Sequence, residues 1–355
     1  MNKSMSGMLR PAALLYRAVV QVRNLWFEKK ILRSRHTPVP VVSVGNITAG
    51  GTGKTPLADW IIRFLISCGE RPALLSRGYG RSTKGIVLVS DGERLLCGSR
   101  ESGDESAMLA ARNPGIVAVV AEKRTEGAAF IMRRFAGRPP SVIVLDDAFQ
   151  HRQLHRDLDI VVVNATEAYF NAAMLPVGRL REPLANIRRA DIAVISNAND
   201  RKTASAIAAD LERRGLQVAQ ARTTPGSLVP FIDAGKPEAA RPGCRVLAFA
   251  GIGSPAGFVG SLEACGCRVD AHRFFRDHEP YTREKLLPML EEARKKGILP
   301  VTTEKDYYRM LGEPWFADLS AEYPLHFLEI SIAFTEGRKV LEEMLIATIR
   351  NFRKA

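Results

Sequence analysis

A glycine-rich segment of the sequence ends in a lysine and a threonine, residue types that bind nucleotide phosphates and their metal ion. It follows an apolar run at Val39–Val44 and precedes an amphipathic stretch at about Leu57–Ser67. Glycines let backbone N–H groups converge on phosphate oxygens, and the amino terminus of a helix adds positive potential. The pattern therefore predicts a nucleotide phosphate site, formed by Gly50, Gly51, Thr52, Gly53, Lys54 and Thr55.

Two residues of this segment carry most of the expected chemistry. Lys54 could reach the β- and γ-phosphates, and the hydroxyl of Thr55 could ligate Mg²⁺. The strict pattern G-x-x-x-x-G-K-[ST] would place its first glycine at Thr48, so the match fails at that position. Gly50 and Gly51 supply the missing flexibility, and we interpret the segment as a phosphate loop.

A second apolar run, Val142–Leu145, ends in the two carboxylates Asp146 and Asp147. Carboxyl ends of parallel strands meet at one edge of a sheet, so an aspartate there lies near a phosphate loop on a neighbouring strand. Carboxylate oxygens suit Mg²⁺. We therefore expect Asp146 and Asp147 on the metal side of the site, together with Thr55.

Other polar residues could serve phosphoryl transfer, although each alone is more often a surface or capping residue. The reaction needs a carboxylate or histidine to accept the proton of the acceptor hydroxyl, and cations on the transferring phosphoryl group. The candidates are Asp104, Glu105, Lys123, Arg124, His151, Arg181, Glu182, Asp277 and His278.

Strand and helix patterns alternate along most of the chain, which is typical of a parallel sheet covered by helices. We predict an α/β fold: a P-loop NTPase-like core with a mostly parallel sheet and helices on both faces, plus a smaller carboxy-terminal α/β domain. The predicted divisions are a helical region at 1–36, a nucleotide-binding domain at 37–222, a linker at 223–242 rich in Pro, Gly and Ala, and a smaller domain at 243–355.

The composition favours anionic partners. In 355 residues, 51 Lys and Arg against 38 Asp and Glu give a formal net charge of +13, so phosphates, nucleotides, acidic lipid or nucleic acid are the expected partners. The 5 cysteines are an odd number in a long chain, which favours free thiols in a reducing compartment. No stretch reads as a transmembrane helix or a secretory signal, and we expect a soluble or peripheral protein on the cytoplasmic side.

Much of the positive charge lies in the first 36 residues, where eight Lys or Arg accompany one acid, Glu28. At helical spacing Leu15, Val19, Val22 and Trp26 share one face, with basic residues along its edges. Such a helix could lie in a membrane interface. The alternative is a helix packed on its own domain with a solvated basic edge.

The order of these motifs resembles that of the tetraacyldisaccharide 4′-kinases, the lipid A 4′-kinases of Gram-negative bacteria. The resemblance runs from about residue 10 to 345 and covers eight motifs. They are Gly45-Asn46 with the phosphate loop through Pro56, Leu75–Arg81, Gly103–Glu105, Asp146–His151, Leu180–Pro183, Phe249–Gly253, Asp277-His278 and Thr303–Asp306. The chain departs from the family pattern at Ser106 and Ala148, both small residues that can alter loop geometry without removing a reactive group.

The resemblance implies ATP-dependent phosphorylation, with Mg²⁺, of the 4′-hydroxyl of a tetraacyl glucosamine disaccharide 1-phosphate, giving lipid IVA. It also implies an amino-terminal helix that docks on the cytoplasmic face of the inner membrane, with no nucleic acid and no obligate protein partner. By the same resemblance, Asp104 and His278 form the acid/base pair on the sugar hydroxyl. Glu105, Arg124, His151, Arg181 and Glu182 are supporting residues.

Asp104 and His278 fall in different predicted domains, so we also expect that closure of the domains assembles the site.

Three alternatives remain open from the sequence. A membrane-cycling P-loop ATPase would also combine a basic amphipathic helix with a phosphate loop. A nucleic-acid-binding protein would explain the positive charge, although no nucleic-acid motif is present. A GTP-using kinase is suggested by Thr303–Asp306, but its Lys and Asp are adjacent, which is the wrong spacing for a guanine-binding Lys-x-Asp pattern.

Overall fold

The protein is described by a computed structural model that covers residues 3–167, 169–170, 172–231, 243–253, 255–276 and 279–354. The chain forms two compact units. The first comprises Met1–Arg77, Ala121–Arg222 and Ala333–Ala355, and the second comprises Gly78–Val120 and Thr223–Ile332.

Parallel strands form the centre of the first unit, in the order β8-β7-β6-β1-β5-β2. Their side chains are buried on both faces, as expected for apolar runs in a parallel sheet. The strands are β1 (Val41–Asn46), β2 (Pro72–Ser76), β5 (Val142–Asp146), β6 (Leu158–Asn164), β7 (Ile192–Ser196) and the start of β8 (Gln217–Pro230).

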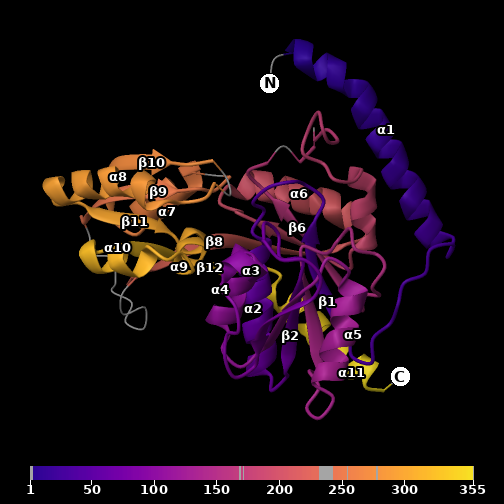
Figure 1. Ribbon diagram of the computed structural model, residues 1–355. Coiled ribbons are helices and arrows are strands. Elements are labelled where there is room, and N and C mark those ends of the chain that lie inside the picture. Colours follow the sequence, from indigo (N-terminus) through magenta and orange to yellow (C-terminus); the bar gives the residue numbers. More distant parts are fainter. Residues whose placement is uncertain are drawn as a thin grey trace. The chain divides into compact units, whose positions relative to one another are not determined.

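Helices cover this sheet (Figure 1). Ile207 and Leu211 of α6 belong to the same core cluster as Val161 and Val163 of β6. Because the side chains of a strand alternate between its faces, Val162 points away from α6. The helices of this unit are α1 (Lys3–Glu28), α2 (Lys54–Ser67), α5 (Arg124–Arg134), the 3₁₀ helix η1 (Leu184–Arg189), α6 (Arg201–Arg213) and α11 (Arg338–Phe352).

The second unit has a core of its own. Parallel strands run in the order β10-β9-β11-β12, and the later part of β8 lies next to β12. An aromatic-rich cluster that includes Phe249, Tyr307 and Phe327 fills the core. Its strands are the antiparallel pair β3 (Val87–Asp91) and β4 (Val117–Val120), with β9 (Arg245–Ala250), β10 (Arg268–Phe274), β11 (Leu299–Thr303) and β12 (His326–Glu336). Its helices are α3 (Ser99–Ser102), α4 (Asp104–Arg112), α7 (Pro255–Ala264), α8 (Arg283–Lys296), α9 (Glu304–Leu311) and α10 (Phe316–Glu322).

The α/β class and the mostly parallel sheet are confirmed, whereas the units do not follow the predicted domain boundaries. Residues 78–120 group with 223–332, and helix α11 groups with the first unit. Asp104 therefore lies in the second unit. The expected domain closure assumed that Asp104 belongs to the nucleotide-binding domain.

The start of the predicted linker is part of strand β8, which continues to Pro230. Leu228 and Val229 are buried there, and the hydroxyls of Thr224 and Ser331 are 2.8 Å apart across the strand pair. Apolar burial and strand pairing thus extend a strand through a stretch whose Pro and Gly content suggested a loop. Residues 232–242 of that linker lie outside the described residues.

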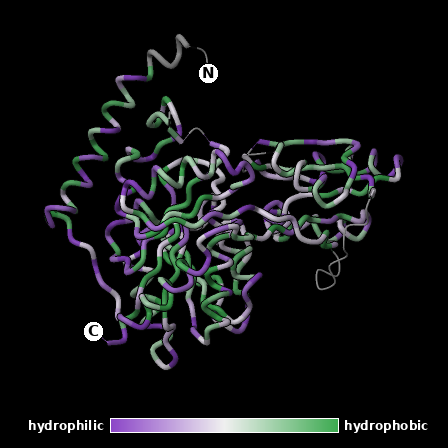
Figure 2. Tube along the Cα trace, turned by 180° about the vertical axis from the view of Figure 1, so that it is seen from behind, coloured by the Kyte–Doolittle hydropathy of each residue, from purple (hydrophilic) through white to green (hydrophobic). Residues whose placement is uncertain are grey.

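Helix α1 is the first element of the chain and runs along the side of the first unit (Figure 1). Val20 and Asn24 are buried on one face, while Leu15, Val19 and Trp26 are 68%, 59% and 47% exposed. Apolar and polar residues alternate along the helix (Figure 2). One face of α1 therefore packs on the protein and another exposes an apolar stripe, and docking of that stripe on a membrane stays a prediction. Among the described residues, no helix is sufficiently long and apolar to cross a membrane.

All 5 cysteines are free thiols in the structure, as the sequence predicted.

Candidate nucleotide and phosphoryl-transfer site

The phosphate loop joins strand β1 to helix α2 and depends on left-handed glycines. Gly50 and Gly53 have φ values of 119° and 81°. A Cβ atom at Gly53 would lie 3.2 Å from the Cβ of Ser196, so space as well as conformation favours glycine. Gly53 has no side chain to cap α2, so the first N–H groups of that helix can bind an anion.

Lys54 is the first residue of α2 and is only 8% exposed. Its Nζ lies 3.5 Å from Thr52 Oγ1 and 3.6 Å from Asp147 Oδ1. Thr52 is itself fixed, because Asn46 Nδ2 donates to its hydroxyl at 2.8 Å and Ser196 Oγ donates to its carbonyl at 2.7 Å. The lysine is thus held between the loop and the strand-end acids.

Of the two predicted acids, Asp146 ends strand β5 and Asp147 follows it. Strand β5 is paired in parallel with β1 at Val44 and Asp146. Asp146 is buried, and its Oδ1 accepts the backbone N–H of Asp147 at 3.0 Å. Asp147 has φ 49°, a left-handed conformation that costs a non-glycine residue of the order of 1 kcal/mol. The strained turn directs the Asp147 carboxylate toward Lys54.

Cations surround Asp147. Arg181 Nη1 lies 3.0 Å from both carboxylate oxygens. Burial would raise the pKa of Asp147, but Lys54 and Arg181 outweigh it and lower the pKa below its usual value. The carboxylate is therefore ionised at neutral pH. Arg124 is a third cationic side chain whose charge lowers the pKa of Asp147.

Arg124 is almost fully buried at the start of α5. Its Nη1 donates to the carbonyls of Ala121 and Glu122 at 2.9 and 3.3 Å. Burial lowers its pKa to about 10, so it stays charged at pH 7.

His151 lies just beyond the strand-end acids. Burial, followed by the charges of Arg124 and Arg77, lowers the pKa of His151 to about 4. The ring is therefore neutral at pH 7, and its predicted supporting role is that of a neutral hydrogen-bonding group.

Glu182 joins the site to helix α1. It is completely buried and accepts hydrogen bonds from Asn24 Nδ2 at 2.8 Å, Asn186 Nδ2 at 2.9 Å and Arg189 Nη1 at 2.6 Å. Neighbouring Arg181 is fixed through its backbone, because its carbonyl accepts the Tyr16 hydroxyl at 3.1 Å. Glu182 thus anchors the segment that presents Arg181 to Asp147.

Sequence reasoning missed Arg179, which lies over the phosphate loop. Its Nε donates to the Ala49 carbonyl at 2.8 Å, its Nη1 lies 3.2 Å from Glu167, and its guanidinium occupies the space that a side chain at Gly50 would need. Its position directly before the Leu180–Pro183 motif was the available signal.

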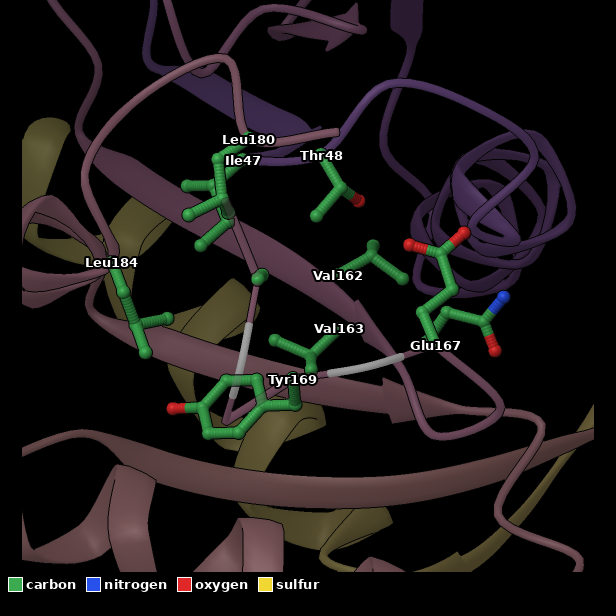
Figure 3. A pocket seen from close by; sticks show the side chains of 10 residues that line it. Ile47, Thr48, Val162, Val163, Glu167, Tyr169, Leu180 and Leu184 are labelled. Carbon is green, nitrogen blue, oxygen red and sulfur yellow. The ribbon is translucent and has the colours of Figure 1, made fainter. Parts of the chain in front are cut away.

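A small pocket, partly open to solvent, borders the loop. Figure 3 shows Ile47 and Leu180 together, facing Val163 and Tyr169. Its lining is largely apolar, with Thr48, Val162, Asn164, Glu167, Ala172 and Leu184 completing it. Such a lining suits an uncharged group rather than a phosphate.

Two further predicted residues, Asp104 and Glu105, lie in the second unit. Asp104 begins α4, and its Oδ2 accepts a hydrogen bond from Arg309 Nε at 3.0 Å. Glu105 Oε1 lies 3.2 Å from Lys305 Nζ. Asp277 and His278 lie outside the described residues, so the pairing of Asp104 with His278 stays a prediction.

Lys123 is exposed and pairs with Glu126 at 2.9 Å, which gives it the role of a surface residue.

A strand, a glycine-rich loop and a helix, with an acidic strand end beside them, define the first unit as a P-loop NTPase-like nucleotide-binding fold. The model of the LpxK family, tetraacyldisaccharide-1-P 4′-kinase, matches residues 5–350. The chain therefore belongs to the tetraacyldisaccharide 4′-kinase family, whose members transfer phosphate to a hydroxyl group.

Relatives and a solved structure agree with this membership. A tetraacyldisaccharide 4′-kinase of Chlorobium limicola is 61% identical over 346 residues, which cover 97% of this chain and 98% of that protein. One of Chlorobium luteolum is 55% identical over 353 residues, which cover 99% of each. The crystal structure of the "apo" form of LpxK from Aquifex aeolicus in complex with ATP is 28% identical with a TM-score of 0.76, covering 97% of this chain and 99% of that one.

Proposed function

We propose that this chain transfers the γ-phosphoryl group of ATP to the 4′-hydroxyl of a tetraacyl glucosamine disaccharide 1-phosphate. The observation that carries the proposal is the buried Lys54 of a phosphate loop beside the ionised Asp147, in a chain of the 4′-kinase family. The similarity to an ATP-bound LpxK supports ATP as the phosphoryl donor.

In this proposal the cationic side chains stabilise the charge that develops on the transferring group. The N–H groups at the start of α2 bind phosphate oxygens, and Lys54 and Arg181 face the same space from either side of Asp147. Phosphoryl transfer depends mainly on such positioning and charge stabilisation. Asp104 together with His278 accepts the proton of the sugar hydroxyl as the bond to phosphorus forms and the bond to ADP breaks.

The donors beside the phosphate loop fit Mg²⁺. Thr55 supplies a hydroxyl, and Asp146 and Asp147 supply carboxylates from the strand next to β1. Mg²⁺ usually binds one or two carboxylates together with substrate phosphates rather than a complete protein cage. Among the described residues, no cluster of three or more His, Cys, Asp and Glu is placed for a metal. When bound, the ion would neutralise charge on the β- and γ-phosphates.

We further propose that α1 docks on an anionic membrane surface, at the cytoplasmic face of the inner membrane. The exposed apolar side chains of Leu14, Leu15, Val19, Val22 and Trp26 support this role, since contiguous exposed apolar surface marks interaction sites. The basic residues that accompany them suit anionic lipid.

A labelled-phosphate transfer assay tests the function. Purified protein, Mg²⁺ and γ-labelled ATP are incubated with the detergent-dispersed lipid acceptor, with Lys54→Ala as the control. We expect label in the lipid with the wild type and a large loss with the variant. Label released only as inorganic phosphate would contradict the kinase and favour a membrane-cycling ATPase.

A further inference from the structure

Three motifs in the second unit contain only one residue with a role in the proposed mechanism, Asp104. They are Gly103–Glu105 at the start of α4, Phe249–Gly253 at the end of β9, and Thr303–Asp306 at the start of α9. Arg309, a residue of α9 outside all of the motifs, contacts each of them.

The guanidinium of Arg309 bridges two carboxylates and a carbonyl. Nε donates to Asp104 Oδ2 at 3.0 Å, while Nη1 donates to Asp306 Oδ1 at 3.0 Å and to the Gly251 carbonyl at 3.2 Å. The side chain of Arg309 is only 11% exposed and that of Asp104 14% exposed. Charged hydrogen bonds in such a setting are stronger and more directional than those at an open surface.

The groups on the far side of Arg309 are fixed in turn. Asp306 is fully buried, and its Oδ2 accepts the Thr303 hydroxyl at 2.6 Å and the Gly251 N–H at 3.2 Å. A Cβ atom at Gly251 would lie 2.9 Å from Arg309 Nη1. The glycine therefore lets the guanidinium approach the backbone, and Asp306 holds it at a defined angle.

We propose that Arg309 is a positioning residue, which holds the carboxylate of Asp104 in the orientation that phosphoryl transfer requires. The inference rests on the proposed function, in which Asp104 takes part in proton transfer. It gives the Phe249–Gly253 and Thr303–Asp306 motifs a shared task, because Gly251 and Asp306 orient Arg309 and Arg309 orients Asp104.

The geometry requires arginine rather than a general positive charge. One planar guanidinium reaches three acceptors in fixed directions, which a lysine ammonium on a flexible stem cannot reproduce. Arg309→Lys should therefore retain the charge and lose the orientation, whereas Arg309→Gln should lose both.

A matched control exists on the same pair of helices. Arg112 of α4 is also nearly buried, and it pairs with Glu304 of α9 at 2.6 Å and donates to the Ile330 carbonyl at 3.0 Å. Arg112→Lys thus perturbs an equivalent buried ion pair between α4 and α9, and it reports the effect of weakened packing alone.

The experiment measures kcat and both KM values of the full-length enzyme in the lipid-phosphorylation assay, together with thermal unfolding. We expect Arg309→Gln to lower kcat about 100-fold, the scale of a lost acid/base contribution, with the KM for ATP nearly unchanged. Arg309→Lys should fall between this variant and the wild type, and added guanidinium ion at millimolar concentration should restore part of the kcat of Arg309→Gln. Arg112→Lys should retain kcat.

The outcomes separate the inference from the proposed function. A wild type that makes no labelled lipid would contradict both. An active wild type with an equally active Arg309→Gln would contradict the inference alone. The inference would also be contradicted if Arg112→Lys and Arg309→Gln lost the same thermal stability and the same kcat. The network around Arg309 would then have only a structural role.

Discussion

At the scale of single residues, Asp147 combines a strained backbone with a functional environment. Its left-handed φ of 49° is unusual for a residue other than glycine, and its carboxylate lies between Lys54 and Arg181. Asparagine tolerates this conformation as well as aspartate does. The charge of Asp147 can therefore be removed with little change to the backbone.

Asp147→Asn should lower the kcat of lipid phosphorylation at least 100-fold, because the metal side of the site loses a carboxylate. The loss should be accompanied by a change of only a few degrees in the unfolding temperature. Asp200→Asn is the matched control, since Asp200 caps α6 through Lys202 and Thr203 and asparagine caps equally well. Equal kcat for Asp147→Asn and the wild type would remove Asp147 from the mechanism.

His151 offers a second prediction through its pKa of about 4. The folded-state pKa lies below the ordinary value of 6.5, so between these two values the unfolded chain binds more protons. Stability due to His151 is therefore present above pH 6.5 and is lost as the pH falls toward 4. Urea unfolding at pH 7 and pH 5 should show a smaller loss of unfolding free energy for His151→Gln than for the wild type. An equal loss would show that His151 is readily protonated in the folded protein.

The positions of some candidate site residues follow from strand ends and loop spacing. Lys54 and Thr55 come after β1, Asp146 ends β5 and Asp147 follows it, so the sheet rule was sufficient to place them at one edge. It could not predict Arg179 over Gly50 or Arg309 against Asp104. These contacts join segments 129 and 205 residues apart, and only the packed structure defines them.

At the scale of elements, helix α1 has one buried face and one exposed face. Val20 is 6% exposed and packs against the first unit, whereas its neighbour Val19 is 59% exposed. The hydrogen bonds of Tyr16 and Asn24 to the Arg181-Glu182 segment attach the helix by its buried side. The same substitution at adjacent positions can therefore separate the proposed membrane binding from folding.

Val19→Asp should weaken binding to vesicles that contain anionic lipid by about tenfold or more, because a charge replaces apolar surface in the interface. It should leave thermal unfolding nearly unchanged. Val20→Asp should do the reverse and destabilise the fold by about 2 kcal/mol or more, because it buries a charge. Co-sedimentation with vesicles and thermal melts measure the two effects. Unchanged vesicle binding of Val19→Asp would contradict the docking role of α1.

The elements themselves were largely predictable, with boundary shifts of a few residues. Val39–Val44 was expected as a strand and β1 covers Val41–Asn46, because apolar residues mark burial more clearly than they mark where hydrogen bonding begins. The failure at Thr223–Pro230 has a different cause. Its Pro225 and Gly226 suggested a loop, but pairing with β12 overrides local preference.

At the scale of the whole molecule, the chain enters the second unit twice. It leaves the first unit after β2, returns after β4, and leaves and returns again within β8 and β12. A division of the sequence into contiguous domains cannot describe such a path, because local composition does not record which distant segments share a core. The predicted boundary after residue 222 coincides with a change of unit, whereas the one at residue 243 does not.

The last prediction follows from the location of the phosphate loop in the first unit, which has a core of its own. Ligands stabilise the state that binds them, and at a free ATP concentration 100 times Kd the gain is about 2.7 kcal/mol. MgATP should therefore raise the unfolding temperature of the wild type by several degrees. Lys54→Ala should abolish most of this shift, because it removes a buried cation beside Thr52 and Asp147. Arg309→Gln should retain the shift, since Arg309 belongs to the second unit. Differential scanning calorimetry with and without MgATP measures all three proteins.

A shift that survives in Lys54→Ala would place the nucleotide away from the phosphate loop. A shift that is lost in Arg309→Gln would mean that the second unit contributes to ATP binding.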